Sequence, residues 1–164
     1  MAILSSEGIE APKFKATAPP IKNVAQIVYV ESSTKVPDSI GIPSDNTPPQ
    51  ITEGTVGLSA SFTPINPNST LVIEYVGVVG AAAANDITVA LFRSGASNAI
   101  HLVSGTVPAA QYTQTFKIRK VIKLVDDPGA RTYSIRFGAN SVASSFNGYN
   151  QLNVASMTIT EYLP

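Results

Sequence analysis

The 164-residue chain contains no cysteine, no tryptophan and a single histidine, His101. Without cysteine there can be no disulfide, thiolate metal ligand, cysteine nucleophile or redox motif. One histidine cannot build a multi-histidine metal centre. The chain also lacks a Gly-x-Ser-x-Gly sequence, a phosphate-binding glycine loop and a dinucleotide fingerprint. We therefore expect a protein that is not an enzyme, with no catalytic residues, no cofactor and no metal.

Charged residues are also scarce, at 13% of the chain, and they balance, with 11 Lys and Arg against 11 Asp and Glu. A nucleic-acid-binding protein normally carries an excess of basic residues that neutralise phosphates, so we expect no nucleic-acid partner. A surface of small polar residues with zero net charge is weakly protected against association. This composition favours a protein that works inside an assembly, with part of its surface covered.

No hydrophobic run is long enough to cross a membrane as a helix. The most apolar stretch, 71–84, contains Glu74 and falls short of the roughly 18–20 apolar residues that a span needs. The first residues, MAILSSEGIEAPKF, lack the basic segment and following apolar segment of a signal peptide. We expect no membrane partner, and a protein that stays in the cytoplasm where it is made unless an assembly carries it out.

Proline is concentrated in the first part of the chain, where residues 1–50 hold seven of the 12 prolines. Because proline lacks an amide donor and disfavours helix in the residue before it, this part is predicted to be extended, with one strand at Gln26–Glu31. We divide the chain into an extended N-terminal arm, residues 1–22, and a β-domain, residues 23–164. The apolar arm residues are candidate anchors onto another chain: Ile3, Leu4, Ile9 and Phe14. The alternative is an arm that packs along its own domain.

From residue 51 onward, apolar and polar residues alternate with the period of two that is typical of half-buried strands. Strands are predicted at Val56–Phe62, Thr70–Gly80, Ile87–Arg93, Gln114–Val125, Arg131–Gly138 and Gln151–Leu163. In the last of these the apolar residues change parity, which predicts a bulge near Ala155–Ser156. No segment shows a convincing helical period with caps.

Turn sequences separate these strands, among them Ser94-Gly95, Ser104-Gly105, Asp126-Asp127-Pro128-Gly129 and Asn147-Gly148. About seven to nine strands with such turns predict an all-β fold, a two-sheet antiparallel β-sandwich. The predicted topology is of the jelly-roll type. An immunoglobulin-like sandwich is the alternative, although the Cys–Trp–Cys core of antibody domains cannot exist here.

Two features could carry chemistry, and each has a plain structural interpretation. Asp126 and Asp127 are the only adjacent carboxylates, and Asp86 is the only other acidic residue in a turn after residue 80. A calcium site needs more converging oxygen ligands, so we interpret the pair as part of a turn. His101 has no orienting carboxylate or nucleophile near it in the sequence, which favours a structural or surface histidine.

A basic stripe lies on one face of the longest predicted strand, where Lys117, Arg119 and Lys123 share the side opposite Phe116 and its apolar neighbours. The functional interpretation is an electrostatic contact to an acidic partner. The structural alternative is a solvated strand face whose charges discourage pairing between sheet edges.

The order of strands and turns over about Asn68–Tyr162 resembles a known group of proteins. The matching segments are NSTLVIEYVGVV, ITVALFR, DDPGARTYSIRFGA, an Asn-Gly turn and SMTITEY. They are similar to the small jelly-roll proteins of tailed-bacteriophage virions: capsid decoration (cement) proteins, head fibres and tail-fibre tips. The resemblance implies a homotrimer without enzymatic activity, located in the virion after assembly in the host cytoplasm. Candidate residues for self-association are Val72, Val76 and Val78, which have no obvious place in the core.

The N-terminal segment separates the members of this group. It lacks the heptads or repeats of a fibre shaft, and an extended arm suits a protein clamped on a capsid lattice. We therefore expect a capsid decoration protein that binds the major capsid protein or another virion protein. The alternative is a receptor- or glycan-binding tip of a tail or head fibre, for which Tyr112, Phe146 and Tyr149 are candidate exposed aromatics. An enzyme, or a sugar-binding module attached to one, is the least favoured class.

Overall fold

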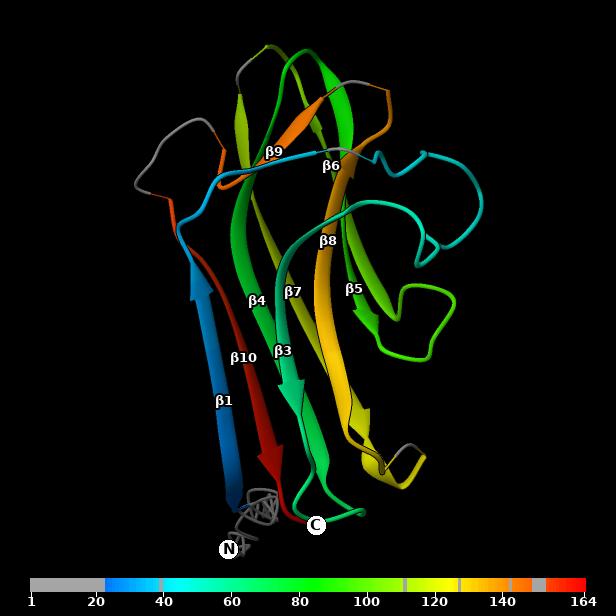
Figure 1. Ribbon diagram of the computed structural model, residues 1–164, viewed down its shortest axis with the longest axis vertical. Coiled ribbons are helices and arrows are strands. Elements are labelled where there is room, and N and C mark those ends of the chain that lie inside the picture. Colours follow the sequence, from blue (N-terminus) through cyan, green and yellow to red (C-terminus); the bar gives the residue numbers. More distant parts are fainter. Residues whose placement is uncertain (1–22, 39, 111, 127, 142, 149–152) are drawn as a thin grey trace, which may run out of the picture.

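The computed structural model describes residues 23–38, 40–110, 112–126, 128–141, 143–148 and 153–164. Within them the chain forms ten strands and one 3-10 turn. They are β1 (Val24–Ser32), β2 (Val36–Pro37), β3 (Thr55–Phe62), β4 (Thr70–Ala81), β5 (Asn85–Arg93), β6 (His101–Val107), β7 (Thr113–Lys123), η1 (Leu124–Asp126), β8 (Arg131–Ala139), β9 (Ser144–Phe146) and β10 (Ala155–Tyr162). The predicted all-β fold is therefore confirmed (Figure 1).

The strands form two antiparallel sheets packed face to face. The long strands of the first sheet run in the order β1-β10-β4-β7. Two short strands complete this sheet: β9 pairs with the end of β4, and β2 pairs with β9. The second sheet has the order β3-β8-β5-β6. Without the short strands β2 and β9, eight long strands remain, and they pair from the outside of the chain inward. Strand β1 pairs with β10, β3 with β8, β4 with β7 and β5 with β6. This nested pairing of a folded-over hairpin is the predicted jelly roll and differs from the immunoglobulin-like alternative.

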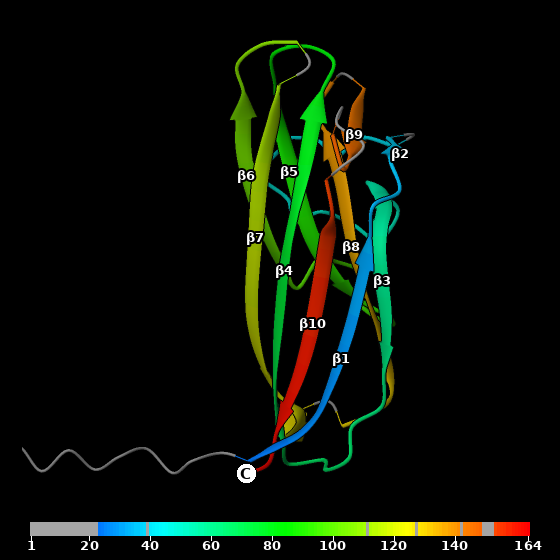
Figure 2. The same ribbon diagram turned by 90° about the vertical axis from the view of Figure 1, so that its left-hand side faces the viewer.

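The two sheets enclose a single large core. Tyr133, Ile135 and Phe137 of β8 point inward and are buried, while Ser134 and Arg136 between them are only half-buried. At one end of the core the Phe146 ring centroid lies 5.4 Å from that of Phe137. Figure 2 shows β7, β4, β10 and β1 of the first sheet side by side, with the second sheet behind them. The alternation seen in the sequence thus marks one face of each sheet as the core side.

Strand β5 departs from the alternating pattern because both of its faces are buried. Ala90 and Phe92, on the side away from the main core, form a small second cluster with Ile42. Residue 42 belongs to the proline-rich connection between β2 and β3, which therefore covers the outside of the second sheet. The guanidinium of Arg136 lies 5.5 Å from the Phe92 ring centroid and donates a hydrogen bond to the carbonyl oxygen of Gly54 (3.0 Å). This connection is a packed part of the domain.

Strand β6 was not among the predicted strands, because Ser104-Gly105 was interpreted as a turn. Both residues lie inside β6, where Gly105 pairs with Ile87 of β5. A Cβ atom at residue 105 would lie 2.7 Å from the side-chain amide of Gln114, at the start of β7. Because that amide is the tip of an exposed, flexible side chain, it can move aside, and the glycine neither ends the strand nor is required by the contact.

The final strand also differs from the prediction. It begins at Ala155, and Asn153 and Val154 before it are not strand. Phe146 of β9 pairs with Val79 of β4, and Ser156 of β10 pairs with Val76 of β4. Two residues that are ten apart in sequence therefore pair with residues only three apart on β4. The change of parity comes from this excursion between β9 and β10, and the pairing of β10 with β4 shows no bulge at the predicted position.

Register shifts occur instead on β1, between Val24 and Gln26, and on β3, between Val56 and Leu58. The longest predicted strand is shorter than expected: β7 ends at Lys123, and the chain turns into η1. The Asn147-Gly148 pair forms the predicted turn, with positive φ angles of 59° and 60°.

Candidate functional site

The basic stripe lies on the outer side of β7. Lys117, Arg119 and Lys123 are all exposed, whereas Phe116 and Ile118, on the opposite side of the strand, are buried in the core. Arg119 Nε lies 3.4 Å from Glu74 Oε1 on the neighbouring strand β4, and both side chains are more than half exposed. An exposed pair of this kind contributes at most about 1 kcal/mol, so both side chains can rearrange to meet another partner.

Unusually many large apolar side chains share this outer face. Ile27 and Tyr29 of β1 are 60% and 57% exposed, Val121 of β7 is 49% exposed, and Val76 of β4 is 37% exposed. Of the other valines expected to take part in self-association, Val72 and Val78 are half-buried. We refer to the solvent side of β1, β10, β4 and β7 as the outer face of the first sheet. Ile27 and Tyr29 are neighbours on β1, and Val121 pairs with half-buried Val72, so exposed apolar area gathers at both edges of this face, as it does at interaction surfaces.

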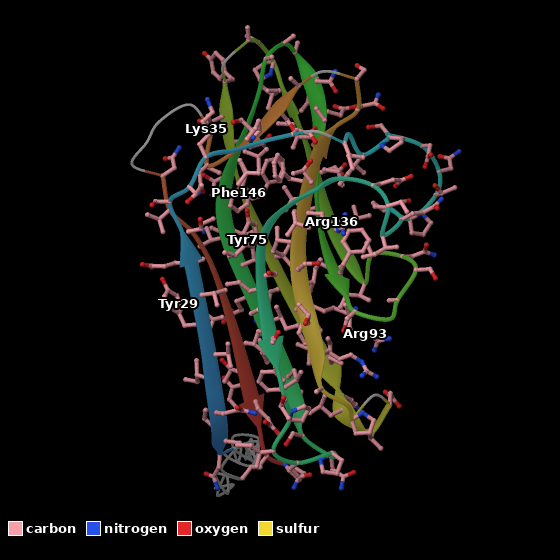
Figure 3. The ribbon with its side chains drawn as sticks, in the orientation of Figure 1. Tyr29, Lys35, Tyr75, Arg93, Arg136 and Phe146 are labelled. Atoms are coloured by element: carbon pink, nitrogen blue, oxygen red, sulfur yellow. The ribbon has the colours of Figure 1, made fainter. Side chains whose placement is uncertain are left out.

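A shallow hollow of about 460 Å³ lies within this outer face. Its outward-facing lining residues are Glu74, Val76, Lys117, Arg119, Ser156 and Thr158. On the far side of β10, the Tyr29 hydroxyl donates a hydrogen bond to Glu31 (2.5 Å). That bond to a carboxylate, with some desolvation, raises the pKa of Tyr29. Figure 3 shows the Tyr29 side chain on the outer side of β1. The face thus offers an aromatic ring, aliphatic groups and charges of both signs.

The other candidate chemical residues are not brought together. His101 is exposed at the start of β6, opposite Leu91. Asp126 is exposed at the end of η1, and Asp127 lies outside the described residues. Asp86 of β5 accepts a hydrogen bond from the hydroxyl of Thr106 (2.7 Å). Across the part of the chain that the structure describes, no group of three or more His, Cys, Asp or Glu residues could hold a metal ion.

The aromatic residues expected at a fibre tip separate in the structure. Tyr112 is 58% exposed in the connection between β6 and β7. Phe146 is wrong as an exposed aromatic, because it is fully buried and packs against Phe137 and Tyr75. Tyr149 lies outside the described residues, as do the four proposed arm anchors Ile3, Leu4, Ile9 and Phe14.

Sequence reasoning recognised the stripe on β7 but not its counterpart on β1. The segment Gln26–Glu31 does alternate: Val28 and Val30 pack against the core, whereas Ile27, Tyr29 and Glu31 are exposed. With apolar residues at both parities, the pattern could not indicate which side faced solvent. An exposed Ile and Tyr beside a Glu becomes informative only once β1 is placed at the edge of the first sheet.

Comparisons with known proteins identify no family for this chain. No family model matches the sequence, and no curated protein matches it. One similar solved structure, described as "CBM4 structure and function", is 11% identical, covers 82% of this chain and 92% of its own, and has a TM-score of 0.31. A second, from "Bacillus endospore appendages form a novel family of disulfide-linked pili", is 15% identical, covers 85% and 92%, and has a TM-score of 0.29. Among the described residues, no helix is long and apolar enough to span a membrane.

Proposed function

We propose that the protein is a non-enzymatic structural component of a tailed-bacteriophage virion, a capsid decoration (cement) protein that binds and stabilises the capsid as a homotrimer. The observation that carries the proposal is the succession of strands and turns over 68–162, which resembles such proteins and lies on a jelly-roll order of strands. The low charge of the chain supports a protein whose surface is partly covered by neighbours.

The proposed attachment uses the N-terminal arm. An extended, proline-rich segment can lay apolar side chains into successive grooves of a neighbouring capsid subunit and add backbone hydrogen bonds to an exposed sheet edge. Ordering such a segment costs conformational entropy, so several anchors must act together. In this proposal the anchors are Ile3, Leu4, Ile9 and Phe14.

The alternative function, a receptor- or glycan-binding fibre tip, is supported by exposed Tyr112 at one end of the sandwich. It is weakened by the burial of Phe146, which removes one of the three aromatics that the alternative requires. Electron microscopy of the native particle separates the two functions. Density for the jelly roll on the capsid lattice supports decoration, and density confined to a tail or fibre supports the tip.

A pelleting assay tests the attachment itself, using particles from which the protein has been stripped. Full-length protein with all four arm anchors changed to serine is expected to lose co-sedimentation with the particles. A second variant, the stripe variant, changes Lys117, Arg119 and Lys123 to serine. Its oligomeric state is measured beside its co-sedimentation, so that lost binding by a protein that still self-associates is assigned to the outer face. If the arm variant binds undiminished and the stripe variant does not, the contact is made by the outer face of the sheet. If the wild-type protein does not bind at all, the decoration proposal is wrong.

A further inference from the structure

The outer face of the first sheet is organised in rows that run across its strands. The hydrogen-bond register aligns three such rows from β1 to β7: Ile27–Thr160–Val72–Val121, Tyr29–Thr158–Glu74–Arg119 and Glu31–Ser156–Val76–Lys117. Each row therefore begins on one edge strand of the four and ends on the other.

The two ends of each of these three rows are chemically complementary, whereas a fourth row, from Val24 to Lys123, has no charged pair at its ends. The first row has apolar Ile27 at one end and apolar Val121 at the other, both about half exposed. The second row has an exposed tyrosine ring and a guanidinium, which attract one another as a cation–π pair. The third has a carboxylate, Glu31, and an ammonium, Lys117, both exposed.

These complementary ends cannot satisfy one another within one molecule. Strands β10 and β4 lie between β1 and β7, which places the row ends about 14 Å apart at the usual spacing of paired strands. The complementarity can be used only between two copies of the chain.

We propose that the outer face of the first sheet is the interface between copies of this chain, related by a rotation axis parallel to its strands. Such an axis keeps every residue at its own height along the strands. The β1 edge of one copy then meets the β7 edge of the next, row against row, so that Ile27 meets Val121, Tyr29 meets Arg119 and Glu31 meets Lys117. A cyclic oligomer of any size about this axis repeats the same contact, and the mass of the oligomer gives the number of copies.

The opposite arrangement is disfavoured by the same residues. Two sheets packed with their strands antiparallel would set each edge strand against its own copy and reverse the heights. Arg119 would then face Arg119 of the other copy, and Glu31 would face Ile27. Like charges and charges set against apolar groups cost free energy at an interface, so the rows select the parallel axis.

The hollow on this face has a place in the proposed contact. Arg119, which meets Tyr29 of the next copy, lines the hollow of about 460 Å³ together with Val76 and Thr158. The Tyr29 ring has room to enter it and lie against the guanidinium. The exposed ion pair of Arg119 with Glu74 is weak enough to adjust to the incoming ring.

The inference concerns self-association alone, so it is tested on purified full-length protein without virions, and its failure leaves the proposed attachment to a capsid untouched. Sedimentation velocity and mass photometry at tens of micromolar are expected to show an oligomer. Glu31→Lys and Lys117→Glu are each expected to weaken self-association by at least about tenfold, because each places like charges in contact. Combined, the two changes restore an opposite pair and should restore association to near the wild-type level.

Lys123→Glu is the matched control, because Lys123 is exposed on the same face of β7 but its row ends at Val24, which carries no charge. Its effect should be small. Thermal melting of each variant, followed by circular dichroism, checks that the fold is retained, and rescue by the charge swap cannot arise from misfolding. A wild-type protein that stays monomeric, or a double variant no better than the single ones, overturns the proposal.

Discussion

The carboxylate of Glu161 accepts the backbone N–H of Ile65 at 3.0 Å. Glu161 lies near the end of β10 and is fully buried, and Ile65 lies in the connection between β3 and β4. The same carboxylate accepts the N–H of Asn66 (3.0 Å) and the side-chain amide of Gln26 on β1 (2.7 Å). One side chain thus joins the last strand, the first strand and the connection that leads from one sheet to the other.

Replacing Glu161 by Gln should destabilise the protein. Burial on its own would raise the pKa of Glu161, but the hydrogen bonds from Ile65, Gln26 and Asn66 outweigh it and lower the pKa. The substitution removes the charge and turns an acceptor into a donor, and it is expected to lower the free energy of unfolding by roughly 2 kcal/mol at pH 7. Urea denaturation of both proteins measures the difference.

The pH dependence gives a second test at the same residue. Because the folded-state pKa is lowered, the ionised carboxylate contributes its full stability above the unfolded-state pKa and loses it as pH falls through the folded-state pKa. The difference in unfolding free energy between wild type and E161Q should therefore shrink as the solution is acidified. A difference that stays constant through this acidic range would show that the charge of Glu161 is not the cause.

Asn147 has two separable roles in its turn. Its φ angle of 59° is left-handed, and its side-chain amide donates hydrogen bonds of 2.9 Å to the carbonyl oxygens of Ser32 and Thr34. These bonds fix the connection between β1 and β2. Asn147→Gly tolerates the backbone angle but loses the hydrogen bonds, which should lower the free energy of unfolding by about 1–2 kcal/mol. Asn147→Ala should lower it by about 1 kcal/mol more, because alanine is strained at positive φ. Equal unfolding free energies for the two variants would contradict a role for the angle.

The parts of the fold that could be predicted are those in which one side of a strand is buried and the other solvated. On β8, Tyr133 and Phe137 alternate with polar residues because only one side meets the core. That signal is missing on β5, where Phe92 is buried beneath the connection that carries Ile42. Alternation of apolar and polar residues indicates which side of a strand faces the core. It cannot predict that a segment distant in sequence will cover the other side.

Only the β7 part of the outer face could be predicted from the sequence, for a related reason. Arg119 could be placed on the outside of its strand from its own neighbours in sequence. Tyr29 belongs to the same surface only because β1 pairs with β10, which joins the two ends of the described chain. Sheet order is set by packing of the whole domain, and no local pattern encodes which edge strand completes a face.

The Tyr75 hydroxyl is expected to contribute nothing to stability. It is buried and has no hydrogen-bond partner among the described residues, and burial raises the pKa of Tyr75. Tyr75→Phe removes the unpaired polar atom and keeps the ring stacked on Phe146, so the free energy of unfolding should stay the same or rise by about 1 kcal/mol. Tyr75→Ala, the control for the ring itself, should cost about 3–5 kcal/mol. A clear loss in the phenylalanine variant would show that the hydroxyl is satisfied in solution.

Gly57 and Phe146 should be strongly coupled. Gly57 lies at the register shift of β3, and a Cβ atom there would lie 2.5 Å from Cδ2 of the Phe146 ring. Phe146 is fully buried between Phe137 and Tyr75, so its ring has little freedom to move aside. Gly57→Ala alone is expected to cost about 1–3 kcal/mol through overpacking.

In a Phe146→Leu background the side chain facing residue 57 is smaller, so the same Gly57→Ala change should cost less. The two substitutions should then destabilise the protein by less than the sum of their separate effects. Urea denaturation of the wild type, both single variants and the double variant completes the cycle. Substitutions at residues that do not interact change the free energy of unfolding additively, to within about 0.5 kcal/mol. Additivity of that kind would mean that the Phe146 ring does not contact Gly57 in solution. A positive coupling would establish that the glycine at this shift in β3 is required by the aromatic cluster beneath it.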